Sequence, residues 1–378
     1  GLLSGDGQMT IGVIVVGTGW GLFTHTRALR DAGFEVRAIV GRDRQRVAER
    51  AAPLGIPLAT DNLAEALEDP ANTIVTVATP PHAHFPFVME AINAGRHIVS
   101  EKPFAKDAAE ARMMRDAAKA AGVLHMLGAE FRFDSAQALL RRVVLSGAIG
   151  APRHFLRIYH QPGSLMPNEP MAPWWEDAAQ GGGFLGAFGS HMFDQIDYMF
   201  GPVTRVSGQL QTLAPGRPHR TADDCYSVQF EAGDGVIGTI VAAQESRSGF
   251  VMCTKVTGTL GGAWIQSGAN YGDPEEVWIH DVAGVRQVPM PEDLVNQPPT
   301  PFPISDLIQT EMDRWHTMGF DVPPYARLFS ELKARLEGQE PGIPERAATF
   351  DDAVRGQAVL DAIRHSAASR SWVDIDHW

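Results

Sequence analysis

From Thr10 onward the chain alternates short runs rich in β-branched residues with segments of helical length. The runs occupy Ile11–Val16, Glu35–Val40, Ile74–Ala78 and His97–Ser100. Apolar strands of this kind, each followed by a helix, are typical of a parallel sheet with both faces covered. The order of elements therefore predicts an α/β domain with a doubly wound parallel sheet.

Helices are predicted in the segments that follow these strands, and capping residues mark their ends. Their expected ranges are Gly21–Ala32, Asp43–Ala52, Phe85–Ala94, Asp107–Ala121 and Asp134–Ser146. Asp107 and Glu110 have the spacing of a capping box, while Gly122 and Gly147 supply glycine stops. A further strand is expected at Val123–Leu127.

After about Ala151 the pattern changes to longer strands joined by hairpin turns. Cys225–Phe230 and Val236–Ala243 flank the compact turn Glu231–Gly235, which indicates antiparallel pairing. We therefore expect a second domain of α+β character, with the first domain over residues 9–132 and the second over 133–378.

The C-terminal part of the chain begins with an irregular segment. Residues 289–303 contain six prolines, and a helical pattern then covers about Tyr325–Gly338. A final amphipathic helix is predicted over Asp351–Ser369, with residues such as Val354 and Ile363 on its apolar side. This last helix could pack back on the first domain.

Composition favours a globular protein whose partners are small molecules. The 378 residues include 32 Lys and Arg against 45 Asp and Glu, and the formal net charge of −13 disfavours nucleic acid and anionic membranes as partners. Hydrophobic residues make up 44% of the chain, which is too many for a disordered protein. No apolar run reaches the roughly 18–20 residues that span a bilayer.

Cysteine content and the first residues bear on location. Cys225 and Cys253 are the only cysteines and show no metal-ligand spacing, and the histidines are scattered, so we expect no metal site, no disulfide framework and a cytoplasmic location. We interpret Gly1–Gln8 as a remnant of an expression vector, because it lacks the features of a signal peptide and the first methionine is Met9.

The first strand leads into a glycine-rich turn that opens a helix. Gly17 and Gly19 would let the backbone turn sharply and approach a pyrophosphate, whose charge a helix N-terminus stabilises. The third glycine of the G-x-G-x-x-G fingerprint is expected at Leu22, whereas Gly21 lies one position earlier. The predicted dinucleotide contacts of this turn are Gly17, Thr18, Gly19, Trp20 and Gly21.

The tip of the second strand bears on which dinucleotide binds. NAD-binding folds place an acidic residue there, which accepts hydrogen bonds from the ribose 2′-hydroxyl. This chain has Gly41 followed by Arg42, and a cation suits the 2′-phosphate of NADP. The pattern favours NADP over NAD, although Asp43 would serve NAD if it reached the 2′-hydroxyl and Arg42 were only solvated.

Three further segments resemble the signature of a known family. Thr79–His84 resembles T-P-x-x-x-H, and Asn93–Pro103, which ends in Glu101-Lys102-Pro103, resembles A-G-K-H-V-x-x-E-K-P. Gly181–Asp194 is similar to G-G-G-x-x-x-D-x-G-x-H-x-x-D. Together they resemble the Gfo/Idh/MocA family, named after glucose-fructose oxidoreductase, inositol dehydrogenase and a rhizopine catabolism protein.

This resemblance implies a Rossmann dinucleotide-binding domain followed by a domain with a large, mostly antiparallel sheet. It also implies a homo-oligomer, a homodimer or a homotetramer. Catalysis in the family centres on the lysine of E-K-P, here Lys102, with the aspartate and histidine of the third segment as partners. His191 matches the histidine, whereas Ala187 replaces the aspartate and leaves open which group exchanges the substrate proton.

The residue types of Lys102 and His191 also suit the oxidation of an alcohol. Oxidation of a secondary alcohol needs a base for the hydroxyl proton and a cation for the developing alkoxide. Lys102 follows a strand end, where open α/β sheets bind ligands, and His191 could carry the proton. The resemblance further suggests a cis Lys102–Pro103 bond. Asp194 could orient His191 or only cap its helical turn.

The remaining candidates divide between cofactor and substrate. The cofactor candidates near the sheet edge are Thr79, Pro80, His84, Glu101 and Lys102. The substrate candidates are Lys102, Tyr159, Trp174, Trp175, His191 and Asp194. His84 and Glu101 have a structural role as their alternative, and the tryptophan pair could be a flat sugar platform or part of a core or interface.

These observations lead to a functional expectation. We expect an NAD(P)-dependent dehydrogenase or reductase that transfers hydride between nicotinamide C4 and a secondary alcohol or ketone of a polyhydroxylated small molecule, such as a sugar, cyclitol or dihydrodiol. A redox-neutral enzyme with tightly bound nucleotide and a cofactor-sensing regulator are the alternatives. Lys102 and His191 argue against the regulator, whereas Ala187 supports it.

Overall fold

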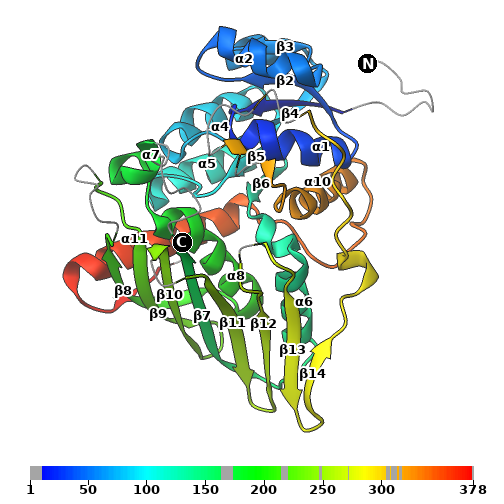
Figure 1. Cartoon of the computed structure of the whole chain (residues 1–378). Coiled ribbons are helices and arrows are strands. Elements are labelled where there is room, and N and C mark those ends of the chain that lie inside the picture. Colours follow the sequence, from blue (N-terminus) through cyan, green and yellow to red (C-terminus); the bar gives the residue numbers. More distant parts are fainter. Residues whose placement is uncertain are drawn as a thin grey trace. The chain divides into compact units, whose positions relative to one another are not determined.

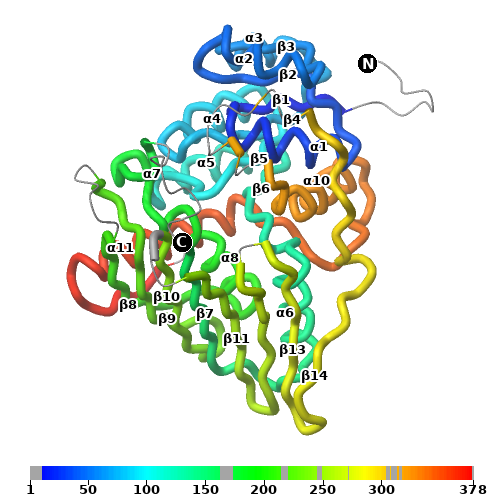
Figure 2. Tube along the Cα trace, viewed as in Figure 1, coloured from blue at the N-terminus to red at the C-terminus, as the bar shows by residue number. Residues whose placement is uncertain are grey.

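The structure is a computed structural model, drawn as a cartoon in Figure 1 and as a Cα trace in Figure 2. It describes residues 11–162, 173–213, 220–246, 249–270, 272–303, 307, 313–314 and 317–376. The remnant expected at Gly1–Gln8 lies outside these residues. No helix in the described part of the chain has the length and apolar content of a membrane span.

The chain forms two compact units, and each is built from two separate stretches of sequence. The first comprises Gly1–Phe133 and Gln297–Asp351, and the second comprises Asp134–Asn296 and Asp352–Trp378. The division after Phe133 lies close to the expected boundary. The expected single break at that point differs from the observed units, because residues 297–351 belong with the first unit rather than the second.

The first unit contains a parallel sheet of six strands in the order β3-β2-β1-β4-β5-β6. The strands are β1 (Gly12–Val16), β2 (Glu35–Val40), β3 (Leu58–Thr60), β4 (Asn72–Val77), β5 (His97–Glu101) and β6 (His125–Gly128). The order reverses direction next to β1, and open α/β sheets bind ligands outside the carboxyl ends of their strands at such a point. The predicted doubly wound α/β fold is confirmed.

The helices of this unit begin and end where local sequence dictates. They are α1 (Thr26–Asp31), α2 (Arg44–Ala51), α3 (Leu63–Leu67), α4 (His84–Asn93), α5 (Ala108–Ala121) and α10 (Val322–Leu336). Asp43 and Asp107 cap α2 and α5 by accepting hydrogen bonds from the backbone N–H groups of Arg46 and Glu110. Gly122 ends α5 with a positive φ of 65°.

Helix α10 explains why residues 297–351 belong to the first unit. It packs against α1 and lies beside it in Figures 1 and 2. Tyr325, Leu328 and Phe329 of α10 share one hydrophobic core with Phe23 and Leu29. Without this helix the apolar side of α1 would face water, at a cost of about 25 cal/mol for each Å² exposed.

The second unit contains a sheet of nine strands in the order β14-β13-β12-β11-β7-β10-β9-β8-β15. The strands are β7 (Pro152–Pro162), β8 (Val203–Gln211), β9 (Cys225–Ala232), β10 (Val236–Ser246), β11 (Val251–Gly258), β12 (Gly262–Gln266), β13 (Glu276–Asp281), β14 (Gly284–Val288) and β15 (Val373–Asp374). Within this second sheet, only the β7–β10 pair is parallel among the described strands. The predicted large, mostly antiparallel sheet is confirmed.

Helices cover one face of this second sheet. They are α6 (Ser135–Leu145), α8 (Ser190–Phe200) and α11 (Phe350–Ser369), with α7 (Pro173–Glu176) in the loop before α8. Helix α6 packs against β12 and β13, and α8 packs against β8 and β9. From Asp352 onward α11 belongs to the second unit, where a Cβ at Gly208 of β8 would lie 2.8 Å from Ile363.

Candidate functional site

The glycine turn after β1 has the backbone that a dinucleotide needs. Gly17 has a φ of +125°, and its N–H donates to the Val40 carbonyl oxygen at 2.8 Å. A Cβ at this position would lie 2.5 Å from the Ala78 carbonyl oxygen, so only glycine fits. The turn is therefore held close to the ends of β2 and β4, at the carboxyl edge of the sheet.

Gly21 takes the place of the displaced third glycine. A Cβ there would lie 2.9 Å from Cγ1 of Val15 and 3.3 Å from Cβ of Ala78, so the glycine lets the helix pack closely on β1 and β4. Leu22, at the usual third position, is fully buried. The helix begins as a π-helical turn over Gly21–His25, whose wider spacing of hydrogen bonds accompanies this shift.

A buried arginine anchors the same turn from α2. Arg50 Nη1 donates to the Thr18 carbonyl oxygen at 2.5 Å, and Nη2 donates to Asp313 Oδ2 at 2.7 Å. Arg50 and Asp313 are both buried. The pair connects the pyrophosphate turn to the returning segment of the chain, a contact that no sequence motif indicated.

These residues fit a dinucleotide. Gly17 leaves a cradle that any side chain would fill, and the turn opens a helix at the edge where such ligands bind. Thr79 follows β4 at this edge, and its buried hydroxyl has no hydrogen-bond partner among the described residues, so it offers a free donor. Pro80 begins the short helical turn Pro81–Ala83 by accepting from the Ala83 N–H at 2.9 Å.

The tip of β2 excludes an acidic side chain at the usual NAD position. A Cβ at Gly41 would lie 2.7 Å from methyl groups of both Thr18 and Val47. Arg42 and Asp43 follow and are exposed. Asp43 Oδ1 accepts from the Arg46 N–H at 3.0 Å as the helix cap.

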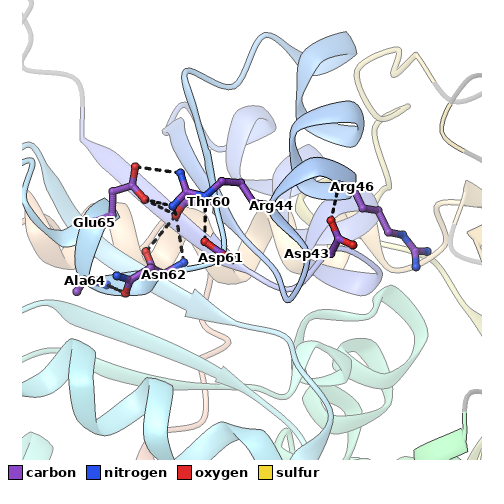
Figure 3. Close-up of polar contacts among 8 residues, drawn as sticks. All are labelled: Asp43, Arg44, Arg46, Thr60, Asp61, Asn62, Ala64 and Glu65. Carbon is purple, nitrogen blue, oxygen red and sulfur yellow. Dashed lines mark hydrogen bonds and ion pairs between the residues drawn. The ribbon is translucent and has the colours of Figure 1, made fainter.

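Arg44, the next cation along the chain, is engaged elsewhere. Figure 3 shows its guanidinium reaching Asp61, Glu65 and Thr60, with distances of 3.0 Å to Asp61 Oδ1 and 2.5 Å to Glu65 Oε2. The hydrogen bond from Arg44 contributes most to lowering the pKa of Glu65. Arg42 therefore remains the cation of this tip whose charge is not neutralised by a neighbouring ion pair among the described residues.

The carboxylate of Glu101, directly before Lys102, accepts several hydrogen bonds in the first unit. Its Oε1 accepts from Trp20 Nε1 at 3.1 Å, from His25 Nε2 at 2.8 Å and from the Tyr325 hydroxyl, while Oε2 accepts from the Lys102 N–H at 3.1 Å. Burial alone would raise the pKa of Glu101, but His25, Lys102 and Tyr325 together keep it below its usual value. The carboxylate is therefore ionised and fixes the backbone that carries Lys102.

Glu130 is a second buried carboxyl group, and its pKa is raised where that of Glu101 is lowered. Burial, and then the negative charges of Asp321 and Glu101, raise the pKa of Glu130 well above its usual value. The pKa of Tyr325 is also raised, first by burial and then by the charge of Glu101. In this cluster the shifts therefore favour the ionised form of Glu101 and the neutral forms of Glu130 and Tyr325.

His84 connects two loops at the sheet edge. Its Nε2 lies 2.7 Å from the Thr79 carbonyl oxygen, and its Nδ1 lies 3.1 Å from the Phe104 carbonyl oxygen. The side chain is fully buried, and burial lowers the pKa of the ring. His84 therefore braces the loop of Thr79 and Pro80 against the segment that follows Lys102, and the predicted cofactor contact at this position stays a prediction.

His191 lies in the first turn of α8 in the second unit. It is 3% exposed, and its ring centroid lies 6.5 Å from that of Phe188 in an edge-on arrangement. Ala187, at the position of the family aspartate, is 5% exposed within the π-helical turn Leu185–Gly189. Asp194 is also buried, one turn of the helix further along.

The glycine run before His191 holds the tryptophan pair. A Cβ at Gly182 would lie 2.1 Å from the Trp174 carbonyl oxygen, and Gly183 donates its N–H to the Trp175 carbonyl oxygen at 3.0 Å. The two indole rings are partly exposed and 5.2 Å apart. Asp223 also holds the start of the π-helical turn after this glycine run, because its Oδ2 accepts from the Leu185 N–H at 2.8 Å.

Tyr159 is more enclosed than a surface contact residue. It is 2% exposed, its hydroxyl donates to Gln161 Oε1 at 3.0 Å, and its ring stacks on Phe188 at 4.2 Å. The structure thus groups Tyr159, Phe188 and His191 in the second unit, and it groups Trp20, Glu101 and Lys102 in the first.

Matches to family models cover most of both units. Residues 11–129 match the model described as an oxidoreductase family with an NAD-binding Rossmann fold, and residues 138–264 match the GFO/IDH/MocA C-terminal domain. These ranges contain every cofactor-binding and substrate-binding candidate predicted from the sequence. The two models cover the expected nucleotide-binding and substrate-binding parts of the chain.

Curated relatives and solved structures agree with these matches. Levoglucosan dehydrogenase of Pseudarthrobacter phenanthrenivorans is 27% identical over 361 residues, which cover 87% of this chain and 86% of that protein. Trans-1,2-dihydrobenzene-1,2-diol dehydrogenase of Mus musculus is 32% identical over 240 residues, 63% of this chain and 68% of that protein. A levoglucosan dehydrogenase structure in complex with NADH and L-sorbose has a TM-score of 0.80 and 25% identity, with 98% of this chain and 100% of that chain covered.

Proposed function

Because the chain belongs to the Gfo/Idh/MocA family of NAD-binding oxidoreductases, we propose that it interconverts a secondary alcohol and a ketone of a polyhydroxylated small molecule. A sugar, a cyclitol or a dihydrodiol is the expected substrate. The observation that carries the proposal is the Glu101 cluster, which holds Lys102 directly after β5 at the carboxyl edge of the sheet.

The cofactor would be held by the residues of the sheet edge. Gly17, Thr18 and Gly19 would receive the pyrophosphate, and Arg42 would meet a 2′-phosphate, so NADP is favoured over NAD. The bound nicotinamide supplies the acceptor or donor of the hydride. Thr79 would donate its free hydroxyl hydrogen to the cofactor, since no described residue uses that hydrogen.

Proton transfer is assigned to two side chains. Lys102 would polarise the reacting oxygen with its positive charge, and His191 would accept the hydroxyl proton during oxidation and return it during reduction. Asp194, one turn after His191, is proposed to keep the imidazole in its orientation. Because Ala187 stands where the family has an aspartate, His191 is the group to which the proton is assigned.

Substrate contacts are proposed from the second unit. Trp174 and Trp175 present partly exposed indole faces, which suit the apolar face of a sugar ring. Tyr159 would act on the substrate through Phe188, because the ring of Tyr159 is buried and stacks on the Phe188 ring. His191 and Asp194 complete the proposed set.

A turnover assay with a lysine variant tests this function. The protein is incubated with NADP or NAD and a panel of sugars, cyclitols and dihydrodiols, and nicotinamide absorbance is followed. Lys102→Ala should abolish turnover while NADPH binding, measured by fluorescence, persists. Lys106→Ala is the matched control, because Lys106 is exposed and, within the described part of the chain, forms its ion pair with Glu110 at 3.7 Å.

The outcomes separate the competing functions. No absorbance change with any substrate would refute the dehydrogenase proposal. Substrate consumption without net change of the nicotinamide would instead identify a redox-neutral enzyme. Cofactor binding with neither result would identify a regulator.

The assembly is proposed to be a homodimer or homotetramer formed through the second sheet. Ile237, Val251 and Val285 are 55%, 44% and 60% exposed, and the strand register places all three on the same face. Light scattering during size-exclusion chromatography tests this, and Ile237→Asp with Val251→Asp should yield monomers.

The two cysteines are free thiols, which supports a location in the reducing cytoplasm.

A further inference from the structure

Arg157 is a buried cation that the proposed mechanism does not use. It lies in the middle of β7 and is 1% exposed, with Thr254 of β11 and Ile240 of β10 as its neighbours in register. Its Nη1 donates to the Thr254 hydroxyl. It forms no ion pair with any residue that the structure describes.

The other edge of the guanidinium has no protein partner among the described residues. Nε is buried without a hydrogen-bond acceptor, and Nη2 makes no hydrogen bond. Burial lowers the pKa of Arg157, and the charge of Glu275 opposes this only in part. Arginine nevertheless stays protonated in proteins, so the free enzyme holds a buried charge that forms no ion pair among the described residues.

The free edge of Arg157 has the geometry of a carboxylate receptor. Nε–H and Nη2–H point in the same direction, and together they match the two oxygens of a carboxylate. Phosphate sites usually add further cations or a helix N-terminus, whereas the polar groups shown to act on Arg157 are hydroxyl and carboxyl groups. A carboxylate is therefore the better match in both charge and shape.

Contacts within the second unit connect this edge to the substrate candidates. Arg157 Cζ lies 5.7 Å from the centroid of the Phe188 ring. Phe188 directly follows Ala187, and its ring stacks on Tyr159. A carboxylate bound at Arg157 would thus lie beside the aromatic residues that adjoin the histidine turn.

We propose that Arg157 binds the carboxylate of an acidic, polyhydroxylated substrate such as a sugar acid. This inference rests on the proposed dehydrogenase function and narrows its substrate class. A neutral polyol would leave the buried guanidinium uncompensated, so the enzyme should select the acid over the corresponding alcohol.

Glu275 gives the site a dependence on pH. Burial, and then the charge of Asp134, raise the pKa of Glu275 to about 7, while Ser267 and Arg157 oppose the rise. The other groups that act on Arg157 are Tyr159, Tyr226 and Asp134, and burial raises the pKa of Tyr226. Ionised Glu275 would compete with the ligand, so acid binding should weaken as the pH rises past about 7.

The test measures binding of matched acid and neutral ligands by calorimetry. The probes are D-gluconate against D-glucitol, D-glucuronate against its methyl ester, and L-tartrate against L-threitol. At least one acid should bind more tightly than its neutral match. Arg157→Met should weaken that binding by about 10- to 100-fold, as expected for losing a hydrogen-bonded charge, and Arg157→Lys should restore it in part.

A control variant and a stability measurement separate this role from a structural one. Arg153→Met changes an exposed arginine of the same strand and should leave acid binding unchanged. Arg157→Met should keep or raise the Tm of the ligand-free protein, because it removes an uncompensated buried charge. A large fall in Tm would instead make Arg157 the structural partner of Glu275 and overturn the proposal, as would the absence of any preference for acids.

Failure of this inference is distinguishable from failure of the proposed function. Turnover of neutral polyols without preference for acids would keep the dehydrogenase and remove the carboxylate site. Acid binding that Arg157→Met abolishes, without nicotinamide turnover, would keep the carboxylate site and remove the dehydrogenase. Glu275→Gln should make acid binding independent of pH near neutrality, and a persisting decline would assign the titration to another group.

Discussion

Removal of the Tyr325 hydroxyl should change stability in a way that depends on pH. Tyr325→Phe deletes one of four donors to the buried Glu101 carboxylate and leaves those of Trp20, His25 and Lys102. A hydrogen bond to a charged group contributes about 1.5–3 kcal/mol, and its loss should raise the pKa of Glu101. The variant should lose stability of that size at neutral pH.

The sign follows from the lowered pKa of Glu101. A carboxyl group whose pKa is depressed by folding stabilises the protein above its unfolded pKa of about 4.3, and this contribution disappears as the pH falls through the folded pKa. The difference in unfolding free energy between the wild type and Tyr325→Phe should therefore be full at neutral pH and shrink in acid. Urea titrations at several pH values measure it.

A neighbouring aromatic residue supplies the matched control. Phe329 packs on Tyr325 and on His25 but has no polar group. Phe329→Leu should lower stability by about 1–2 kcal/mol through lost packing, by the same amount at every pH. A pH-independent loss for Tyr325→Phe, or none at all, would refute the role of its hydroxyl.

Three further substitutions have defined outcomes. Gly17→Ala should abolish tight cofactor binding in a fluorescence titration, because its Cβ would lie 2.5 Å from the Ala78 carbonyl oxygen; undiminished affinity would contradict this. Gly41→Asp should lower stability by about 1–3 kcal/mol through crowding against Thr18, and an unchanged Tm with improved NAD binding would show that the tip has room. Glu130→Gln should raise the unfolding free energy above about pH 4.3. A carboxyl group whose pKa is raised by folding lowers the stability of the protein as the pH rises, and the amide removes this loss. Urea titrations that show equal stability of the variant and the wild type at neutral pH would exclude a raised pKa at Glu130.

Local patterns predicted the first unit well because its elements follow from neighbouring residues. Buried parallel strands are continuous apolar runs, and Asp107 caps its helix as its spacing from Glu110 indicated. Asp43 and Asp134, the first residues of two other expected helices, also act as caps. The glycine turn was also predicted from the sequence. The close packing that requires glycine at position 21 was not, because the neighbouring atoms belong to Val15 of β1 and to Ala78, which follows β4.

The rest depended on contacts between distant parts of the sequence. Tyr325 and Glu101 are separated by 224 residues, and no motif connects them. The short strand β3 and helix α3 passed unnoticed because they have few residues on which a period could be seen. Arg157 occupies an inward position of β7 that sequence alone would assign to a surface cation, since its burial depends on β10 and β11.

The discontinuous first unit has a consequence for synthesis on the ribosome. Its hydrophobic core needs Tyr325, Leu328 and Phe329, so the nascent nucleotide-binding unit exposes the apolar side of α1 until more than three quarters of the chain has emerged. Strands β7 to β14 of the second unit's sheet are translated during this interval, and β15 follows α10. Truncation after Phe133 should therefore give an aggregating fragment, and chaperone demand during translation should be greatest before α10 appears.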